Sequence, residues 1–459
     1  MDNAIQQIHE ASLSLLENPG IRLEHPAICE KFLARGAKTG AMADVVRIPR
    51  ELLMEIIALA PSEIALNGRL GTATQILTPA GGTAIWSCPG MNWYRRGELR
   101  PFTSENMAAH ARLLDALPQV DGVFGVAMKD VPPAVGDVAG LSIMAQNTAK
   151  HIRVLCFTPR GGEFLRNAAP LYPGNWLSMG FTSHGPLRWT HLALEMFAAS
   201  AGAGIPVTVN GEPMAGTSGP VTVAGSAAVG NAEILAGIAV NQLLEPGRPC
   251  IYNLGLAHLF DMRTACVITG GPESHIFADL SARLGRFYNL PSCSWVSTES
   301  LTPDAQAGYE KALGFQTHLA SRVSLVWGVG QLESATTISP AQAVIDNEIL
   351  ASVRRIARGA EISEETIALE TIREVGICGD FLGTDHTLDN FRTAIWQPDI
   401  SFRAKRARWL ETGAKDLAAV AEDRADALIA ATAEKAAACR EATRDLAALA
   451  DEFMKTGWR

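Results

Sequence analysis

The sequence predicts a parallel α/β fold, and within that class a (β/α)8 TIM-type barrel. Seven short runs of apolar or β-branched residues recur over roughly 300 residues, which is the pattern of buried strands. Longer amphipathic segments separate these runs, and connections of that length suit the crossovers between parallel strands. The dinucleotide-binding fingerprint that is usual in open sheets of this class is not found, which favours the closed barrel.

Residues 1–80 are expected to form an N-terminal helical cap segment ahead of the barrel. Its amphipathic segments cover residues 5–17, 27–37 and 50–60. Pro26 and Pro49 precede the second and third segments, and Gly36 lies near the end of the second. Proline at a helix start and glycine near its end are typical of short helices joined by turns.

The barrel itself is assigned to residues 81–402. The seven strand candidates are GVFGVAM (122–128), IRVLCFT (152–158), WLSMGFT (176–182), IPVTVN (205–210), PCIYNL (249–254), PSCSWVS (291–297) and RVSLVWG (322–328). A weaker eighth strand is expected near residues 370–378. The alanine-rich residues 403–459 form a C-terminal helical extension, predicted to be a long helix packed by one face and suited to contacts in a homo-oligomer.

The composition is that of a packed globular enzyme and excludes several other classes. The chain has 459 residues with 47% hydrophobic and only 19% charged residues, which excludes a disordered protein. Its net charge is -9 and its basic residues are scattered, so a nucleic acid partner is excluded. The eight cysteines form no C-x-x-C pair and are expected to be reduced and buried.

The protein is expected to be cytoplasmic and to have no membrane partner. The first residues lack the basic and apolar regions of a secretory signal. The longest uncharged stretch, 213–232, is interrupted by prolines and glycines, so a transmembrane helix is not expected there.

Motifs for phosphate, dinucleotide and zinc binding are missing from the sequence. No Walker-type phosphate loop is found, and Gly328-Val329-Gly330 has Glu333 where a dinucleotide fingerprint needs its third glycine. No pair of Cys or His residues has the spacing of a zinc site, so no metal is expected to be bound by this chain.

Aromatic residues gather instead near the carboxyl ends of the strand candidates. Trp86, Tyr252, Trp295 and Trp327 lie at or just beyond such ends, and Phe260 follows one of them. In a parallel barrel those ends surround the active site. A cage of aromatic faces binds a quaternary ammonium group, although each ring taken alone is as well explained as a core residue.

Five segments in order along the chain carry a resemblance to one enzyme family. They are LENPGIRLEHP (16–26), VRIPRELLMEIIALAPSEIALNGR (46–69), PDAQAGYEKAL (303–313), GQLESATTISPAQAVIDNEIL (330–350) and IREVGICGDFLGTDHT (372–387). With them the sequence resembles the trimethylamine:corrinoid methyltransferase family. The resemblance implies transfer of a methyl group to the cobalt of a corrinoid (cobalamin), which a separate cognate corrinoid protein presents.

Ser297 occupies the position at which the founding members of that family carry pyrrolysine, counting back from Asp304 and Gln306. The chain therefore resembles the non-pyrrolysine branch, which includes enzymes that act on glycine betaine. A quaternary ammonium already carries a positive charge and leaves as a neutral amine, so no general acid is needed. We expect a quaternary amine as the methyl donor, and an SN2 attack by Co(I) on an N-methyl carbon held in line and shielded from water.

The resemblance also suggests roles for single residues. Ser297 is expected to face the cavity, and Gln306 and Glu333 lie in matching motifs. Glu333 is a candidate to balance the charge of the substrate, with a carboxylate at a helix N-terminus as the equal alternative. A carboxylate on the substrate would need a donor, and the candidates are His184, His258, His386, Arg263 and Gln331, each of which is also explained by a structural role in a loop.

Several alternatives stay open at this stage. The chain has Thr298-Glu299-Ser300-Leu301 where family members often have Thr-Asp-Ser-Lys, and Cys378 to Leu382 where they often have Gly-Gly-His-Phe-Leu. These departures leave open a longer or cyclic betaine, a tertiary amine, or a methylated sulfur compound as the donor. Folate as a direct acceptor and a betaine-binding barrel without catalysis are further alternatives. No corrinoid-binding segment is found, so an apolar rim for a partner is expected at the barrel mouth.

Overall fold

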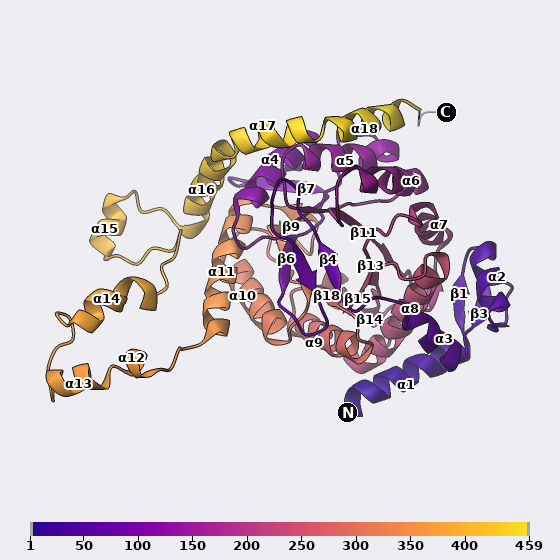
Figure 1. Cartoon of the computed structure of the whole chain (residues 1–459), viewed down its shortest axis with the longest axis horizontal. Helices are drawn as coiled ribbons and strands as arrows, with labels where there is room; N and C mark the ends of the chain where they lie inside the picture. Colours follow the sequence, from indigo (N-terminus) through magenta and orange to yellow (C-terminus); the bar gives the residue numbers. More distant parts are fainter. Residues whose placement is uncertain (1–2, 457–459) are drawn as a thin grey trace.

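The chain folds into a closed barrel of eight parallel strands, seen in a computed structural model that describes residues 3–456 (Figure 1). In chain order the strands are β6 (Ala84–Ser87), β9 (Gly122–Phe124), β10 (His151–Arg153), β11 (Leu177–Thr182), β13 (Val207–Asn210), β15 (Cys250–Gly255), β18 (Ser292–Trp295) and β19 (Leu325–Val329). The last strand, β19, pairs in parallel with the first, β6, and closes the barrel. The predicted fold class is confirmed.

One helix follows each strand and forms the outer layer, as the amphipathic segments predict. These helices are α4 (Ser104–Ala116), α5 (Gly136–Ala145), α6 (Pro159–Ala168), α7 (His191–Ser200), α8 (Val223–Leu244), α9 (Pro272–Phe287), α10 (Ala305–Ala320) and α11 (Pro340–Arg358). Helix α8 is long and apolar enough to cross a membrane by length and composition, but 72% of its apolar window is buried. It packs against β15 and the N-terminal helix α1 (Asn3–Glu17), as a core helix does.

The seven strand candidates all correspond to barrel strands, whereas the expected eighth strand is wrong. Residues 369–375 form the exposed helix α13 (Leu369–Val375), which lies outside the barrel. The missing strand is β6, which precedes the other seven and consists of only four residues, Ala-Ile-Trp-Ser. All four residues of β6 are buried, because the strand lies between β19 and β9.

A short hairpin packs against the amino-terminal end of the barrel. Its strands are β4 (Ile64–Leu66) and β5 (Gln75–Leu77). Ile64, Leu66 and Leu77 pack against the inward residues near the strand starts, which include Ala84 and Leu325. The barrel interior is therefore sealed with apolar side chains at this end, and its opening lies at the carboxyl ends of the strands.

The N-terminal segment lies on the outside of the helical layer. Helix α1 packs against α8, as does α3 (Arg50–Ile57), and α2 (Pro26–Ala34) lies beside them. Strand β1 (Ile21–Leu23) pairs with β3 (Val45–Arg47) and with β12 (Arg188–Trp189), which belongs to the loop after β11. The small sheet is completed by β2 (Lys38–Thr39).

Short strands in four of the loops surround the barrel mouth. The hairpin β7 (Asn92–Arg95) and β8 (Glu98–Pro101) follows β6. Strands β14 (Met214–Ala215), β16 (His258–Asp261) and β17 (Cys266–Ile268) form a second sheet, in loops after β13 and β15. Strands β20 (Gln331–Leu332) and β21 (Thr337–Ile338) follow β19 and join the first hairpin.

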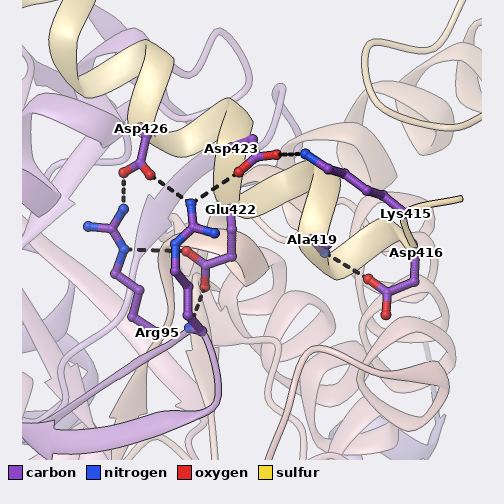
Figure 2. A network of polar contacts seen from close by, with 8 residues as sticks. Arg95, Lys415, Asp416, Ala419, Glu422, Asp423 and Asp426 are labelled. Atoms are coloured by element: carbon purple, nitrogen blue, oxygen red, sulfur yellow. Dashed lines mark hydrogen bonds and ion pairs between the residues drawn. The ribbon is translucent and has the colours of Figure 1, made fainter. Parts of the chain in front are cut away.

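The C-terminal extension is not one long helix, and from Leu417 to Thr456 it forms three consecutive helices. They are α16 (Leu417–Ala431), α17 (Ala433–Ala442) and α18 (Arg444–Thr456), with Thr432 and Thr443 at the breaks. Helix α16 packs against α11 and α4, and α18 packs against α5 and α6. Two arginines of the β7–β8 hairpin bind the acidic face of α16: Arg96 lies 2.9 Å from Asp426 and 3.1 Å from Asp423, and Arg95 lies 3.4 Å from Glu422 (Figure 2).

Residues 360–415, which we call the arm, leave the body between α11 and α16 (Figure 1). The arm holds the short helices α12 (Glu364–Ile367), α13, α14 (Asp385–Ala394) and α15 (Arg406–Glu411). None of these four helices has a buried residue.

Candidate functional site

The inward side chains at the carboxyl half of the barrel divide into an aromatic wall and a polar wall. Trp295, Trp327 and Phe124 belong to one apolar cluster inside the barrel and form the aromatic wall. The ring of Phe124 meets that of Trp327 edge-on, with centroids 5.1 Å apart. Asn210 and Asn253 form the polar wall, joined by a 2.9 Å hydrogen bond from the Asn253 amide to the Asn210 side-chain oxygen.

Arg153 of β10 lies inside the barrel between these two walls. Its guanidinium carbon lies 4.9 Å from the ring centre of Phe124 and 5.8 Å from that of Trp327. The guanidinium donates to the Val154 carbonyl and to the Thr208 hydroxyl, the latter at 3.3 Å. Only 5% of Arg153 is exposed, and burial lowers its pKa to about 9, so the group still carries its charge at neutral pH.

No carboxylate of the described residues 3–456 forms an ion pair with this buried cation. Arg153 also keeps an unpartnered Nε, and the indole nitrogens of Trp295 and Trp327 are buried without a hydrogen-bond partner. Buried polar groups are normally hydrogen-bonded, and a buried charge is normally paired. Arg153 therefore lacks a partner for its charge and for its Nε–H, and the two neutral indole N–H groups inside the barrel lack acceptors.

Gly180 of β11 leaves the space that the Arg153 side chain occupies. A Cβ atom at this position would lie 2.4 Å from Nη2 of Arg153 and 2.1 Å from the Thr208 hydroxyl. No real Cβ atom tolerates such contacts, so the neighbouring strand needs glycine here for the arginine to lie flat across it.

Two titratable side chains lie further out, beyond the ends of β13 and β15. Glu212 keeps 38% of its side chain accessible although protein surrounds most of it. This burial raises the pKa of Glu212 to about 7. Nδ1 of His258 lies 4.0 Å from Glu212 and donates to the Leu256 carbonyl at 2.9 Å. Burial lowers the pKa of His258, which keeps its ring neutral at pH 7.

Ser297 lies at the end of β18 and is buried beneath the loop that precedes α9. Its hydroxyl shares a 2.6 Å hydrogen bond with the hydroxyl of Thr269. Glu299 fixes that loop, because one of its oxygens accepts from the backbone N–H groups of Thr269 at 2.6 Å and Gly270 at 2.7 Å. Ser297 is thus held in a defined position by the loop in front of it.

The segment around Gln306 fixes the loop between β18 and α10, which carries Glu299. Asp304 caps α10, accepting from the Ala307 N–H at 3.1 Å and from the Ser300 hydroxyl at 2.8 Å. Gln306 donates to Glu310 at 3.0 Å, and Glu310 in turn accepts from the Glu299 N–H at 3.1 Å. Gln306 therefore reaches the mouth only through Glu310.

Glu333 and Gln331 belong to the turn after β19. Glu333, Ser334 and Ala335 all have positive φ angles, of 51°, 51° and 69°, which is a strained backbone for residues other than glycine. The Glu333 N–H donates to the Ser300 carbonyl at 3.0 Å, and its carboxylate accepts from the Thr337 hydroxyl. Gln331 is fully buried, donating to the Val296 carbonyl at 3.2 Å and accepting from the Ala335 N–H at 2.9 Å.

Other side chains expected at the mouth lie elsewhere. Tyr252 points outward, and its hydroxyl donates to Asn231 of α8 at 2.8 Å. Trp86 is inward but deep, stacked on His151 with ring centres 5.0 Å apart, near the sealed end. His184 is exposed in the loop after β11, and His386 lies on α14 of the arm. The structure does not bring these four residues together.

The remaining expected residues lie over the mouth. Phe260 and His258 belong to strand β16 of the small sheet, where Phe260 is half-buried. Arg263 is exposed at the tip of the same hairpin and pairs with Asp261 at 3.0 Å. Of the expected residues, Trp295 and Trp327 lie opposite each other on β18 and β19, Ser297 follows on the β18 side, and His258 lies on β16.

Sequence reasoning missed the polar interior of this site. Arg153, Asn210, Asn253 and Glu212 were not expected there, nor was Phe124. A usable signal exists in the strand IRVLCFT, because an arginine within an otherwise apolar strand points either to an edge or to a charged interior.

Comparisons with known proteins agree with this architecture. The family model described as "Trimethylamine methyltransferase (MTTB)" matches residues 1–120 and 138–451. Trimethylamine methyltransferase MttB of Desulfitobacterium hafniense (strain DSM 10664 / DCB-2) is 32% identical over 90% of this chain and 86% of its own length. Glycine betaine methyltransferase of Desulfitobacterium hafniense (strain Y51) is 30% identical over 89% of this chain and 87% of its own length.

A solved structure shares the fold. The monomethylamine methyltransferase MtmB of Methanosarcina barkeri superimposes with a TM-score of 0.54 at 12% identity, covering 94% of this chain and 87% of that chain. At this identity the likeness concerns the barrel fold alone.

Proposed function

The chain belongs to the trimethylamine methyltransferase (MTTB) family, and from this premise we propose that it demethylates a betaine-type zwitterion, with a separate corrinoid protein as the methyl acceptor. The substrate in this proposal carries a quaternary ammonium at one end and a carboxylate at the other. The relative named glycine betaine methyltransferase supports the substrate class, and the unpaired charge of Arg153 supports the carboxylate.

The single observation that carries the proposal is the unpaired cation inside the barrel. Arg153 is positively charged and buried, and no carboxylate of residues 3–456 neutralises it. A carboxylate on the substrate supplies the missing charge and also accepts from the free N–H groups of Trp295 and Trp327. Trimethylamine has no such group, and as a cation it would be repelled by Arg153.

The position of Arg153 sets the direction in which the substrate lies. With its carboxylate at Arg153, the substrate points its ammonium outward, toward the open carboxyl ends of the strands. In this proposal Glu212, which is partly accessible beyond the end of β13, provides a negative charge there, and Trp295 provides an aromatic surface for the N-methyl groups. The methyl group is thereby presented at the mouth, where an external acceptor can reach it.

The leaving group requires no proton, because the quaternary nitrogen becomes a neutral amine when it loses a methyl group. The task of this chain is to hold the zwitterion, to exclude water and to orient one N-methyl bond. In this proposal Ser297 lines the pocket, while Gln306, Glu333 and Gln331 position the loops after β18 and β19 that surround it.

Bound to its own protein, the corrinoid would supply a Co(I) nucleophile that accepts the methyl group. The rim of the mouth fits a large apolar partner, since exposed apolar side chains follow five of the strands: Met91, Phe157, Val221, Met262 and Leu301. Such a patch around an opening is typical of a docking surface.

Calorimetric titration followed by a transfer assay tests this function. We expect glycine betaine to bind at least tenfold more tightly than tetramethylammonium or acetate, because each of these has only one of the two charges. With Co(I) cobalamin as the acceptor, dimethylglycine should form from glycine betaine, measured by mass spectrometry. Turnover of trimethylamine or of a methylated sulfonium compound, without turnover of any betaine, would contradict the proposal.

A further inference from the structure

The arm has the length of a small domain but no core. It spans residues 360–415, and its four helices have only four to ten residues each. Figure 1 shows these helices projecting from the side of the barrel. Helices this short are not stable in water on their own, because they need packing to offset the cost of ordering the chain.

Apolar side chains are concentrated on this unpacked segment. Twelve large apolar side chains of the arm are exposed, among them Ile362, Ile377, Leu382, Leu388 and Ile395. Ile377 is 100% exposed and Leu382 is 79% exposed. Together they present on the order of 1,000 Å² of apolar surface, which is the amount that one partner contributes to a stable interface. A monomer rarely exposes so much apolar surface in one place.

The base of the arm is fixed to the body, so the arm projects in a defined direction. Glu348 of α11 accepts from the backbone N–H groups of Asp399, Ile400 and Ser401, at 2.7, 2.8 and 2.9 Å. Arg424 of α16 adds an ion pair with Asp399 at 2.8 Å. Residues 360–398 of the arm precede this anchor in the chain, and residues 402–415 follow it.

The charges of the arm are divided between its two halves. Residues 360–389 contain eight acidic residues and one basic residue, whereas residues 390–415 contain six basic and two acidic residues. Within the described part of the chain, no ion pair joins the two halves: Arg373 pairs with Glu370 and Arg408 with Glu411, each inside its own half. The acidic half of one arm therefore complements the basic half of another.

From these observations we infer that the arm is an interface with a second copy of this chain. Apolar side chains of the two arms bury one another, and each acidic half faces the basic half of the other copy. The self-complementary charge favours this occupant over a different protein, since an arm carrying both signs matches itself. The family match runs through the arm, to residue 451, so the arm belongs to the conserved plan of these proteins and not to an insertion.

Light scattering on the full-length protein measures the predicted assembly. We expect the wild-type protein to have at least twice the mass of one chain at micromolar concentration. The double variant Ile377→Asp with Leu382→Asp should reduce the mass to that of one chain. Both side chains are exposed, so these changes should leave the melting temperature of the barrel unchanged. Leu192→Asp on α7 is the matched control, because Leu192 is 49% exposed on a helix of the barrel body.

Two charge-reversal variants distinguish an assembly that forms through the arms from one that forms through another surface. One variant carries Glu361→Lys and Glu374→Lys, and the other carries Lys405→Glu and Arg406→Glu. Each variant alone should lose at least tenfold in association constant at low salt, and a mixture of the two should recover it. Hydrogen exchange of residues 360–415 should be slow in the wild type and fast in each single variant.

Two results would overturn the inference. A wild-type protein with the mass of one chain would show that the arms do not pair. An assembly that survives both the apolar and the charge variants would place the contact elsewhere. If the arm becomes protected from exchange only when a corrinoid protein is added, that protein is its occupant and a second copy is not.

Discussion

At the scale of single residues, the unpaired guanidinium of Arg153 makes the sharpest prediction. Arg153→Met should weaken glycine betaine binding by roughly ten- to a hundredfold, since a charge-assisted hydrogen bond contributes about 1.5–3 kcal/mol. Binding of tetramethylammonium should not weaken. Calorimetry on both ligands measures the difference.

Arg248 provides a matched control for this change. It is also buried, but it lies outside the barrel interior and donates to the Ile205 carbonyl at 2.9 Å and to the Ser200 hydroxyl at 3.1 Å. Arg248→Met should lower the melting temperature and leave betaine affinity unchanged. Equal loss of betaine affinity in both variants would show that Arg153 acts only through stability.

Glu212 predicts a pH dependence of substrate binding. Its pKa is raised to about 7, so its carboxylate becomes negative as the pH rises from 6 to 8. Betaine affinity should rise over the same interval, because the negative charge stabilises the ammonium. Burial lowers the pKa of the neighbouring His258. Calorimetry at several pH values should show this rise in the wild type and a flat profile in Glu212→Gln.

The raised pKa of Glu212 also makes the stability of the folded protein depend on pH. The folded protein binds the Glu212 proton more tightly than the unfolded chain, whose pKa is near the ordinary 4.5. Stability contributed by this group is therefore present below pH 4.5 and is lost as the pH rises toward 7. Glu212→Gln should remove this loss and raise the melting temperature at pH 8. A melting temperature of Glu212→Gln below that of the wild type at pH 8 would contradict the burial of this carboxylate.

Single residues also show where sequence reasoning reaches its limit. The alternation of a strand predicts that Tyr252 and Asn253 face opposite sides, but not which of them faces inward. Here the tyrosine packs against α8 and the asparagine lines the barrel. The aromatic residues Trp295 and Trp327 were found because strand ends are recognisable, whereas Arg153 requires knowledge of what surrounds it.

At the scale of elements, the start of α10 connects the PDAQAGYEKAL motif to the loop near Ser297, because Asp304 both caps the helix and binds Ser300. Asp304→Ala should cost about 1 kcal/mol through the lost cap. It should also lower kcat, since the cap carboxylate holds the Ser300 hydroxyl in the loop near Ser297. Asp416 caps α16 in the same way, accepting from the Ala419 N–H at 2.8 Å (Figure 2), but its carboxylate does not hold the loop that carries Ser300.

Asp416→Ala is therefore the matched control for the cap. Its thermal unfolding should show a similar loss of stability with an unchanged kcat for betaine. If both variants keep wild-type turnover, the motif around Gln306 has a purely structural role.

The elements were predictable where their pattern is long. Seven strands with their crossover helices follow from periodicity and turn residues alone. Strand β6 was missed because its four residues carry no period, and only pairing with β19 and β9 makes it a strand. The strand expected near residue 370 is wrong, because the segment forms a short helix of the arm and its apolar residues are exposed.

At the scale of the whole molecule, the proposed function gives the mouth two partners of different size. In this proposal the zwitterion lies between the two walls of the barrel, and the corrinoid protein approaches from outside. The interior set of Arg153 and its free donors is separate from the exposed rim, where Met262 is 66% exposed at the tip of the β16–β17 hairpin. Affinity for the substrate and affinity for the acceptor protein should therefore be separable by mutation.

Met262→Asp tests this separation. A charge in the rim should raise the KM for the corrinoid protein by about tenfold or more, because the aspartate would lose its hydration when the two proteins associate. The Kd of glycine betaine, measured without the acceptor protein, should stay the same, and so should transfer to free cobalamin. Leu192→Asp, on the outer helix α7, controls for an added surface charge and should change neither quantity. If Met262→Asp slows transfer to free cobalamin and to the corrinoid protein equally, the hairpin shapes the substrate pocket, and the acceptor docks on another face.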